Sequence, residues 1–173
     1  MNIFILNKTH SENVKMYVDS HIVKMPLEYA QMLCTVVNEK VGYQITPYKS
    51  THINHPCTLW AGECKQNFLY LWNLMQYTDA ERMFRFGKTE EHLSVRTLTD
   101  AGVYKFASLF RYSDLESELT EFPQCMPDYC KADTVDQAYR NYYLHEKQHI
   151  WKWTKRPMPD FIKQYLTEEL VDI

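Results

Sequence analysis

Residues 11–41 read SENVKMYVDSHIVKMPLEYAQMLCTVVNEKV, and this stretch decides the fold class. Apolar side chains recur along it at spacings that fall on one helical stripe: Val14, Val18, Met25, Tyr29, Met32 and Val36. Such a stripe is typical of an amphipathic helix that packs one face against a core. Ser11 is a suitable N-cap for this helix. Because proline lacks the N–H that a helix needs, Pro26 is expected to bend the helix or to start a new one.

The same period, together with residues that start or stop helices, predicts further helices along the chain. We expect helices over residues 56–86, 90–110 and 133–154 and a short one from 160, with loops over 42–57 and 113–131. Gly87 ends the longest of them, and the break at Gly102 makes the limits of the next one less regular. The first six residues, MNIFIL, form a short strand or a buried arm. The predicted architecture is all-α: a compact single-domain helical bundle of residues 1–173 with a short N-terminal arm.

Composition narrows the functional classes. The chain has 173 residues and is 45% hydrophobic, enough for the core of one domain. Four scattered glycines disfavour the glycine-rich phosphate loops of nucleotide-binding α/β folds. A net charge of −3 argues against gripping duplex DNA over the whole surface, but it allows a local basic patch. Five cysteines without CxxC spacing, and no apolar run of membrane-spanning length, predict a soluble cytoplasmic protein with reduced thiols and no membrane partner.

Four polar residues of the first long helix share one face beside its apolar stripe. The set comprises His21, Lys24, Glu28 and Gln31. Their spacings of three, four and three residues place them within a sector of about 80°. A structural interpretation makes Lys24 and Glu28 an ion pair and leaves His21 bonded inside the protein. A catalytic interpretation makes Glu28 a partly buried acid or base assisted by a neighbouring amine and imidazole.

A polar loop, YKSTHINHPC at residues 48–57, precedes the longest predicted helix. Its substrate-binding candidates are Lys49, His52, Asn54 and His55. The free N–H groups of a helix N-terminus favour an anion such as phosphate, although these side chains can also simply cap the helix. The HxxHxC spacing permits a metal site as well, but it lacks an HExxH or paired CxxC partner. We therefore expect no metal and no other cofactor.

Aromatic and basic residues alternate in the predicted helix 133–154. Arg140, Tyr143 and Lys147 are further substrate-binding candidates there, and Arg85 at the end of the longest helix could join the same positive rim. Aromatic rings interleaved with cations can stack bases and neutralise phosphates. The same side chains serve equally well in a core whose lysines reach out to solvent, and Arg85 is also favourable simply as a charge at a helix C-terminus.

The order of these features resembles the phage pyrimidine-dimer DNA glycosylase family of the endonuclease V type. That family has a short N-terminal arm and a helix with Asp-x-His, followed seven residues after the His by the catalytic Glu. This sequence matches with Asp19-Ser20-His21 and Glu28. The family's Gly-His-Val before a long helix resembles Asn54-His55-Pro56, and its tyrosine-rich C-terminal segment is similar to YRNYY at 139–143. The resemblance covers about half of the chain through short motifs.

The resemblance implies an N-glycosidase-like phage enzyme that acts on a nucleobase–sugar bond in DNA or a nucleotide, in the host cytoplasm. In that family an N-terminal α-amine attacks the sugar C1′ and displaces the base, and the Glu assists proton transfer. The resulting imine allows strand cleavage. Here Met1 stands at the nucleophile position, Glu28 at the carboxylate position and His21 as a substrate or structural contact. An α-amine suits this role because α-amines titrate near neutral pH.

The sequence departs from the family pattern at the nucleophile. The family exposes a small residue after Met removal, whereas Asn2 follows Met1 here, so a retained Met1 would supply the amine. Lys24, one turn before Glu28, is an alternative amine, and Glu28 could instead activate water. Pro56 and the segment 90–131 also make this chain longer than the family type.

Two other functional classes fit the same sequence. A non-catalytic phage protein that binds a nucleotide or nucleic acid, and modulates a host enzyme or defence, would keep the aromatic and basic residues without needing Glu28. A metal-dependent phosphoesterase would instead use His52 and His55 with His145 or His149.

Overall fold

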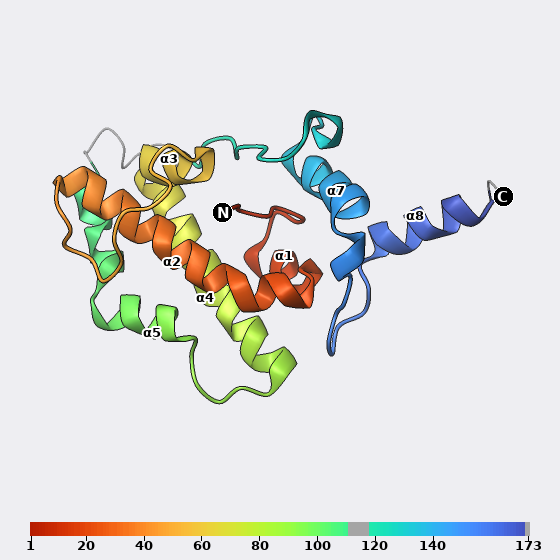
Figure 1. Cartoon of the computed structure of the whole chain (residues 1–173), viewed down its shortest axis with the longest axis horizontal. Helices are drawn as coiled ribbons and strands as arrows, with labels where there is room; N and C mark the ends of the chain where they lie inside the picture. The colour runs from red at the N-terminus through yellow and green to blue at the C-terminus, as the bar shows by residue number, and fades with distance from the viewer. Residues whose placement is uncertain (111–117, 172–173) are drawn as a thin grey trace.

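Helix α2 (Asp19–Val41) and helix α4 (Lys65–Phe86) pack against each other through the middle of the molecule, as Figure 1 shows. The side chains of Ile22 and Met32 on α2 are buried, as are those of Phe68 and Leu71 on α4. Burial of this apolar stripe is the main source of hydrophobic stabilisation. The computed structural model describes residues 1–110 and 118–171.

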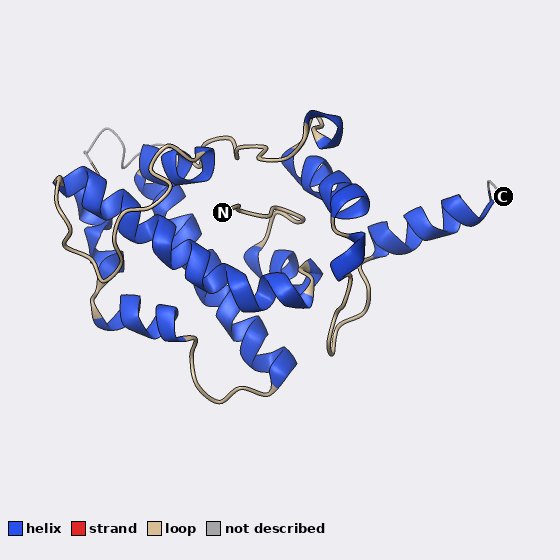
Figure 2. Cartoon of the chain, viewed as in Figure 1, coloured by secondary structure: helices blue, strands red, loops and turns tan. Residues whose placement is uncertain are grey.

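The remaining elements, with one exception, lie around this central pair. They are α1 (His10–Met16), α3 (Pro56–Glu63), α5 (Leu93–Asp100), α7 (Val135–Glu146), α8 (Asp160–Val171) and the 3₁₀ turns η1 (Val103–Leu109), η2 (Asp128–Cys130) and η3 (Gln148–Ile150). The exception is α8, which projects away from the central pair beyond α7 in Figure 1. Helix α1 packs on α4, α3 on both central helices, and α5 on α2. Figure 2 shows only helix and loop in the described ranges, which confirms the all-α prediction. None of the helices described is long and apolar enough to cross a membrane.

The first six residues form a buried arm and not a strand. The side chains of Ile3, Phe4, Ile5 and Leu6 are all at most 5% exposed. In Figure 1 the arm enters between α2 and α3 on one side and α7 on the other, so the chain's N-terminus lies inside the ring of helices. The short α1 follows directly, beginning at His10 after the N-cap Thr9, slightly before the expected cap at Ser11. The helix predicted from Ser11 onward is in fact two helices, because the backbone of Tyr17 and Val18 is extended between α1 and α2.

The structure lacks a helix start that the sequence allowed at Pro26, and it has a helix break at Cys64 that the sequence did not predict. Helix α2 continues through Pro26 without a break, because the side chains around it are buried and tertiary packing outweighs the lost backbone hydrogen bond. The expected single helix 56–86 is divided at Cys64, whose backbone is extended and whose Sγ accepts the amide of Asn67. Asn67 also donates to the carbonyl of Trp60 at 2.8 Å, which stabilises the break.

The later helices are shorter than predicted. The expected helix 90–110 consists of α5 and the 3₁₀ turn η1, separated at Gly102, which adopts a φ of +65°. The expected helix 133–154 ends at Glu146 and continues only as η3. Of the loop predicted over 113–131, residues 113–117 lie outside the described part, and η2 interrupts the remainder. Gly87 ends α4 as predicted, in the left-handed conformation.

Candidate functional site

Side chains, instead of a β-ladder, hold the N-terminal arm. Asn13 of α1 accepts a hydrogen bond from the amide of Leu6 (2.6 Å) and donates to the carbonyl of Phe4 (2.9 Å). From the other side, the guanidinium of Arg140 on α7 donates to the carbonyl of Leu6 (3.0 Å). Because buried backbone groups need partners, these contacts determine the path of the arm and with it the position of Met1.

The arm brings the α-amine of Met1 to within 3.6 Å of Oε2 of Glu28 on α2. The other carboxylate oxygen lies 2.8 Å from Nζ of Lys24. The side chain of Glu28 is 12% exposed and that of Lys24 is 67% exposed, so the lysine reaches the carboxylate from the solvent side. The side chain of Met1 is only 3% exposed, whereas the residue as a whole is half-buried. The part of Met1 that solvent reaches is therefore its main chain, which carries the amine.

His21 lies next to this group on the same face of α2. Its ring stacks on Phe4 of the arm, with centroids 4.2 Å apart, and its Nδ1 shares a hydrogen bond of 2.7 Å with the Tyr143 hydroxyl. Burial, together with the positive charges of Lys147 and Lys24, lowers the pKa of His21 to about 3. His21 is therefore neutral at pH 7, and both lysines act on it electrostatically.

The polar loop before α3 contributes residues of two kinds. Lys49, His52 and Asn54 are exposed, and His52 has a φ of +50° with Nδ1 bonded to its neighbour Thr51. His55 is half-buried, and its side chain caps α3 by accepting the amide of Cys57 at 3.2 Å. Burial lowers the pKa of His55, and the nearby Met1 amine lowers it further, whereas Glu28 opposes the change. The charges of the Met1 amine and of Glu28 therefore both act on His55.

The structure corrects two of the substrate-binding predictions. The side chain of Arg85 is fully buried and donates to Glu81, Asp19 and backbone carbonyls of α1, so it forms no positive rim. Tyr143 is also fully buried, so it can orient His21 but cannot contact a substrate directly. Burial of an arginine and a tyrosine inside a helical core follows from three-dimensional packing, which their spacing in the sequence did not reveal.

The other predicted binding residues are spread more widely. Arg140 is 28% exposed and is engaged by the arm and by Asp136 at 3.5 Å. Gln31 is half-buried, one helical turn beyond Glu28. Lys147 is half-buried, with its ammonium 4.5 Å from the centroid of the Tyr142 ring. Of these three, the charge of Lys147 is the one that reaches His21.

Three residues at the site were not predicted from the sequence. Asn2 is buried, and its Oδ1 accepts the hydroxyl of Tyr139 (2.6 Å) while its Nδ2 donates to the carbonyl of Cys125 (3.0 Å). Sγ of Cys57 lies 3.7 Å from Oδ1 of Asn2 and 3.6 Å from Sγ of Cys125. A cysteine pair 68 positions apart leaves no periodic signal, so only the folded chain reveals it.

The histidines of the phosphoesterase hypothesis do not form a metal centre together. Among the residues described, one group of three or more His, Cys, Asp or Glu side chains places its ligand atoms within 4.8 Å of one another: His55, Cys57 and Cys125. His52, His145 and His149 are exposed and lie outside that group. The prediction that His52 and His55 bind a metal together with His145 or His149 is therefore wrong.

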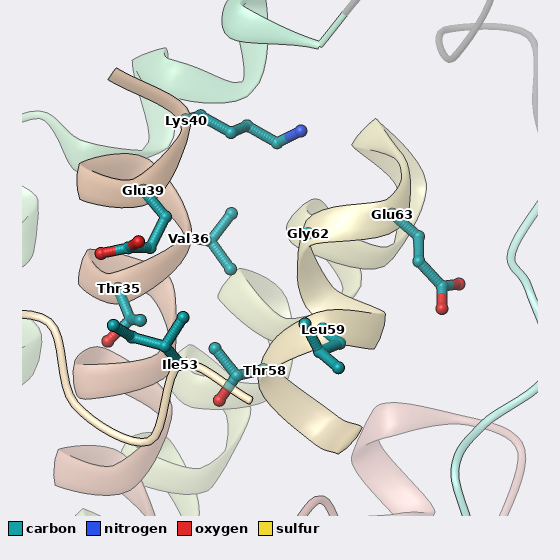
Figure 3. A pocket seen from close by; sticks show the side chains of 9 residues that line it. All are labelled: Thr35, Val36, Glu39, Lys40, Ile53, Thr58, Leu59, Gly62 and Glu63. Carbon is teal, nitrogen blue, oxygen red and sulfur yellow. The ribbon is translucent and has the colours of Figure 1, made fainter. Parts of the chain in front are cut away.

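A separate pocket of about 410 Å³ lies between α2 and α3, shown in Figure 3. Val36, Leu59 and Gly62 form its apolar wall, and Glu39, Lys40 and Glu63 stand around it. Neither Met1 nor Glu28 lines it. The pocket is thus distinct from the group around the α-amine.

Comparison with known protein families, with curated proteins and with solved structures finds no match, so the functional argument depends on the geometry of this chain.

Proposed function

We propose that this protein is an N-glycosidase of phage type that cleaves a nucleobase–sugar bond in DNA or a nucleotide. The α-amine of Met1 is the nucleophile and Glu28 is the proton-transfer carboxylate. The observation that carries the proposal is the 3.6 Å separation between the Met1 nitrogen and Oε2 of Glu28. Catalytic contacts in a protein without substrate are often longer than the hydrogen-bonding distance that they reach in the complex, so this separation suits the role.

The chemistry follows from these two groups. The amine nitrogen forms a bond to C1′ as the C1′–base bond breaks, and the electron pair leaves with the base, which takes up a proton. Glu28 then accepts a proton from the attached amine and passes it to the ring oxygen O4′ as the C1′–O4′ bond breaks, so that the sugar ring opens to an imine. In DNA, loss of a proton from C2′ expels the 3′-phosphate and cleaves the strand. Each proton transfer needs a carboxylate close to the amine and shielded from bulk water, as Glu28 is.

The charges around the amine favour a phosphate-bearing substrate. Because burial lowers the pKa values of His21 and His55, both rings are neutral at pH 7 and do not compete for the Glu28 carboxylate as cations. The positive charge at the site therefore comes from Lys24 and Lys147, two flexible ammonium groups of the kind that attract phosphates.

Borohydride trapping tests the imine. The protein is incubated with a duplex oligonucleotide that carries one abasic site, then reduced, and the cross-linked peptide is identified by mass spectrometry. We expect the cross-link at the α-nitrogen of Met1. Glu28→Gln should lower the rate of trapping and of strand cleavage by about 10²–10⁴-fold, the usual contribution of a positioned acid or base.

Glu39→Gln is the matched control, because Glu39 is an exposed carboxylate of the same helix away from the amine. It should leave the rates unchanged. A cross-link at Lys24 would refute Met1 as the nucleophile. Full activity of Glu28→Gln would refute the role of Glu28 and leave the Met1–Glu28 contact as a structural ion pair.

The non-catalytic alternative predicts a different result in the same samples. A binding protein would be stabilised thermally by nucleotide or oligonucleotide in both the wild type and Glu28→Gln, and no product would form. The observation that favours this alternative is the exposed Lys24 together with the half-buried Lys147, since both can hold a phosphate without any reaction.

A further inference from the structure

A second chemical group lies beside the α-amine, and the proposed glycosidase reaction does not use it. Sγ of Cys57 and Sγ of Cys125 are 3.6 Å apart, and an imidazole nitrogen of His55 lies within 4.8 Å of both. Cys57 is buried, and the other two residues are half-buried, so solvent and ions can reach the group from one side.

We propose that His55, Cys57 and Cys125 bind one Zn²⁺ ion. In tetrahedral zinc sites, Zn–S distances of about 2.3 Å place two thiolate sulfurs about 3.7 Å apart, close to the separation observed here. A disulfide would need the sulfurs at about 2.05 Å. Two sulfurs and one imidazole nitrogen are also a donor set that zinc prefers over harder cations such as Mg²⁺.

The fold positions the three ligands before any ion binds. Cys57 lies in the first turn of α3 and His55 is the N-cap of that helix, so one short segment provides two ligands with a constant separation. Cys125 comes from the loop before η2, and Asn2 holds that loop by donating to the Cys125 carbonyl. Contacts of this kind orient metal ligands. The Cys57 thiol also donates to Oδ1 of Asn2, a contact that ends when zinc replaces the thiol proton.

The sequence alone contained half of this arrangement. The HxxHxC spacing included His55 and Cys57, but no nearby CxxC offered another thiolate. The fold supplies that thiolate from Cys125, 68 positions later.

Binding is a simple exchange of protons for the metal. Zn²⁺ replaces the protons of the Cys57 and Cys125 thiols and takes one nitrogen lone pair from His55, and no electron is transferred. Three protein ligands leave a fourth position for water. The site is independent of the glycosidase proposal, because it requires neither Glu28 nor a reaction at Met1.

Cobalt substitution and zinc titration test the site. The full-length protein, kept reduced with a phosphine, is titrated with Co²⁺ and then with Zn²⁺. We expect one equivalent of Co²⁺ to give the intense d–d bands of a tetrahedral complex and a sulfur-to-cobalt charge-transfer band. Zn²⁺ should displace it with a dissociation constant below about 1 μM.

Three variants make the result specific. Cys125→Ser should weaken Zn²⁺ binding by more than about 100-fold and remove part of the charge-transfer band. His55→Asn should weaken it similarly while keeping an acceptor for the N-cap of α3. Cys130→Ser is the matched control from the same segment, since Cys130 is outside the group, and it should bind like the wild type.

Two outcomes would overturn the proposal. One is fully reduced protein that gives no tetrahedral cobalt spectrum. The other is Zn²⁺ binding that Cys125→Ser and His55→Asn leave unchanged, which would place the metal elsewhere.

Discussion

At the scale of single residues, the site combines buried polar side chains whose partners come from distant segments. His21 stacks on Phe4 of the arm and bonds Tyr143 of α7. A spacing of seven residues relates His21 to Glu28 on the helix surface, but burial decides the protonation state of His21. The neutral form of His21 is the one that the folded protein stabilises.

Acid should therefore destabilise the protein partly through His21. Its pKa is about 3 in the folded state and about 6.5 in an unfolded chain, so the unfolded state binds more protons between these values. The free energy of unfolding should fall as the pH is lowered from about 6.5 toward 3, with a slope from this group of up to about 1.4 kcal/mol per pH unit. Urea denaturation at several pH values in this window measures the slope.

Comparison of two histidine variants isolates this contribution. His21→Asn keeps a polar atom near the Tyr143 hydroxyl and should show a shallower slope than the wild type. His149→Asn, at an exposed position, should keep the wild-type slope. Equal slopes for all three proteins would show that His21 is protonated alike in the folded and unfolded chains.

At the scale of elements, the N-terminal arm depends on side chains of its neighbours. An isolated extended segment inside a helical protein has no strand beside it to satisfy its backbone groups. Asn13 does so for Leu6 and Phe4, and Asn38 does the same for the loop after α2, accepting the amides of Ile45 and Thr46. Two buried asparagines thus replace the hydrogen bonds of a ladder.

Asn13→Ala should release the arm. It removes the acceptor of the Leu6 and Asn7 amides, whereas the Phe4 carbonyl still accepts the Tyr17 hydroxyl, so we expect the free energy of unfolding to fall by about 3 kcal/mol. Amide hydrogen exchange of residues 3–6 should accelerate more than that of the core of α2, and the Met1–Glu28 contact should be lost along with imine trapping. Native-state hydrogen exchange and denaturation measure both effects.

Asn38→Ala is the matched control for this prediction. Asn38 is similarly buried and makes the same kind of bonds, but to a loop far from the arm. It should destabilise the protein comparably without accelerating exchange in residues 3–6. Unchanged exchange in the arm of Asn13→Ala would contradict the role of Asn13.

At the scale of the whole molecule, a buried charge network ties the C-terminal segment to the central helices. Arg85 of α4 lies 3.1 Å from Asp19 and 2.7 Å from Glu81, and Arg156 pairs with Glu81 at 2.8 Å. Burial raises the pKa of Asp19, but the hydrogen bonds from Thr154 and the Arg85 charge outweigh it and lower the pKa overall. The carboxylate forms are therefore stabilised in the folded state, and their contribution is lost in acid.

Arg85→Met should be strongly destabilising, because it leaves Asp19 and Glu81 as buried carboxylates with fewer partners. Removal of one member of a buried ionic network costs about 3–5 kcal/mol. Arg96→Met, which removes a 50% exposed arginine paired with Glu90, should change the free energy of unfolding by less than about 0.5 kcal/mol. Equilibrium urea denaturation of both variants at pH 7 measures the difference. Similar stabilities would show that Arg85 is dispensable for the fold.

Much of the fold followed from local pattern. The apolar period predicted the buried stripe of α2, and Gly87 predicted the end of α4, because helix amphipathicity and capping depend on neighbouring residues. The period did not predict the break at Tyr17 and Val18 that separates α1 from α2. The break at Cys64 did not follow, since it depends on Asn67 bonding to Trp60 and to Thr120, which is distant in the chain. The uninterrupted course of α2 through Pro26 likewise reflects packing.

The sequence by itself determined the helical class of this protein and the face of α2 on which His21, Lys24 and Glu28 lie, because a helix of known period places them there. Only the tertiary structure decided which groups meet that face: the Met1 amine, and beside it the thiols of Cys57 and Cys125. It also removed Arg85 from the surface. The physical reason is that burial and long-range hydrogen bonding depend on the whole folded chain, whereas periodicity is a property of a few neighbouring turns.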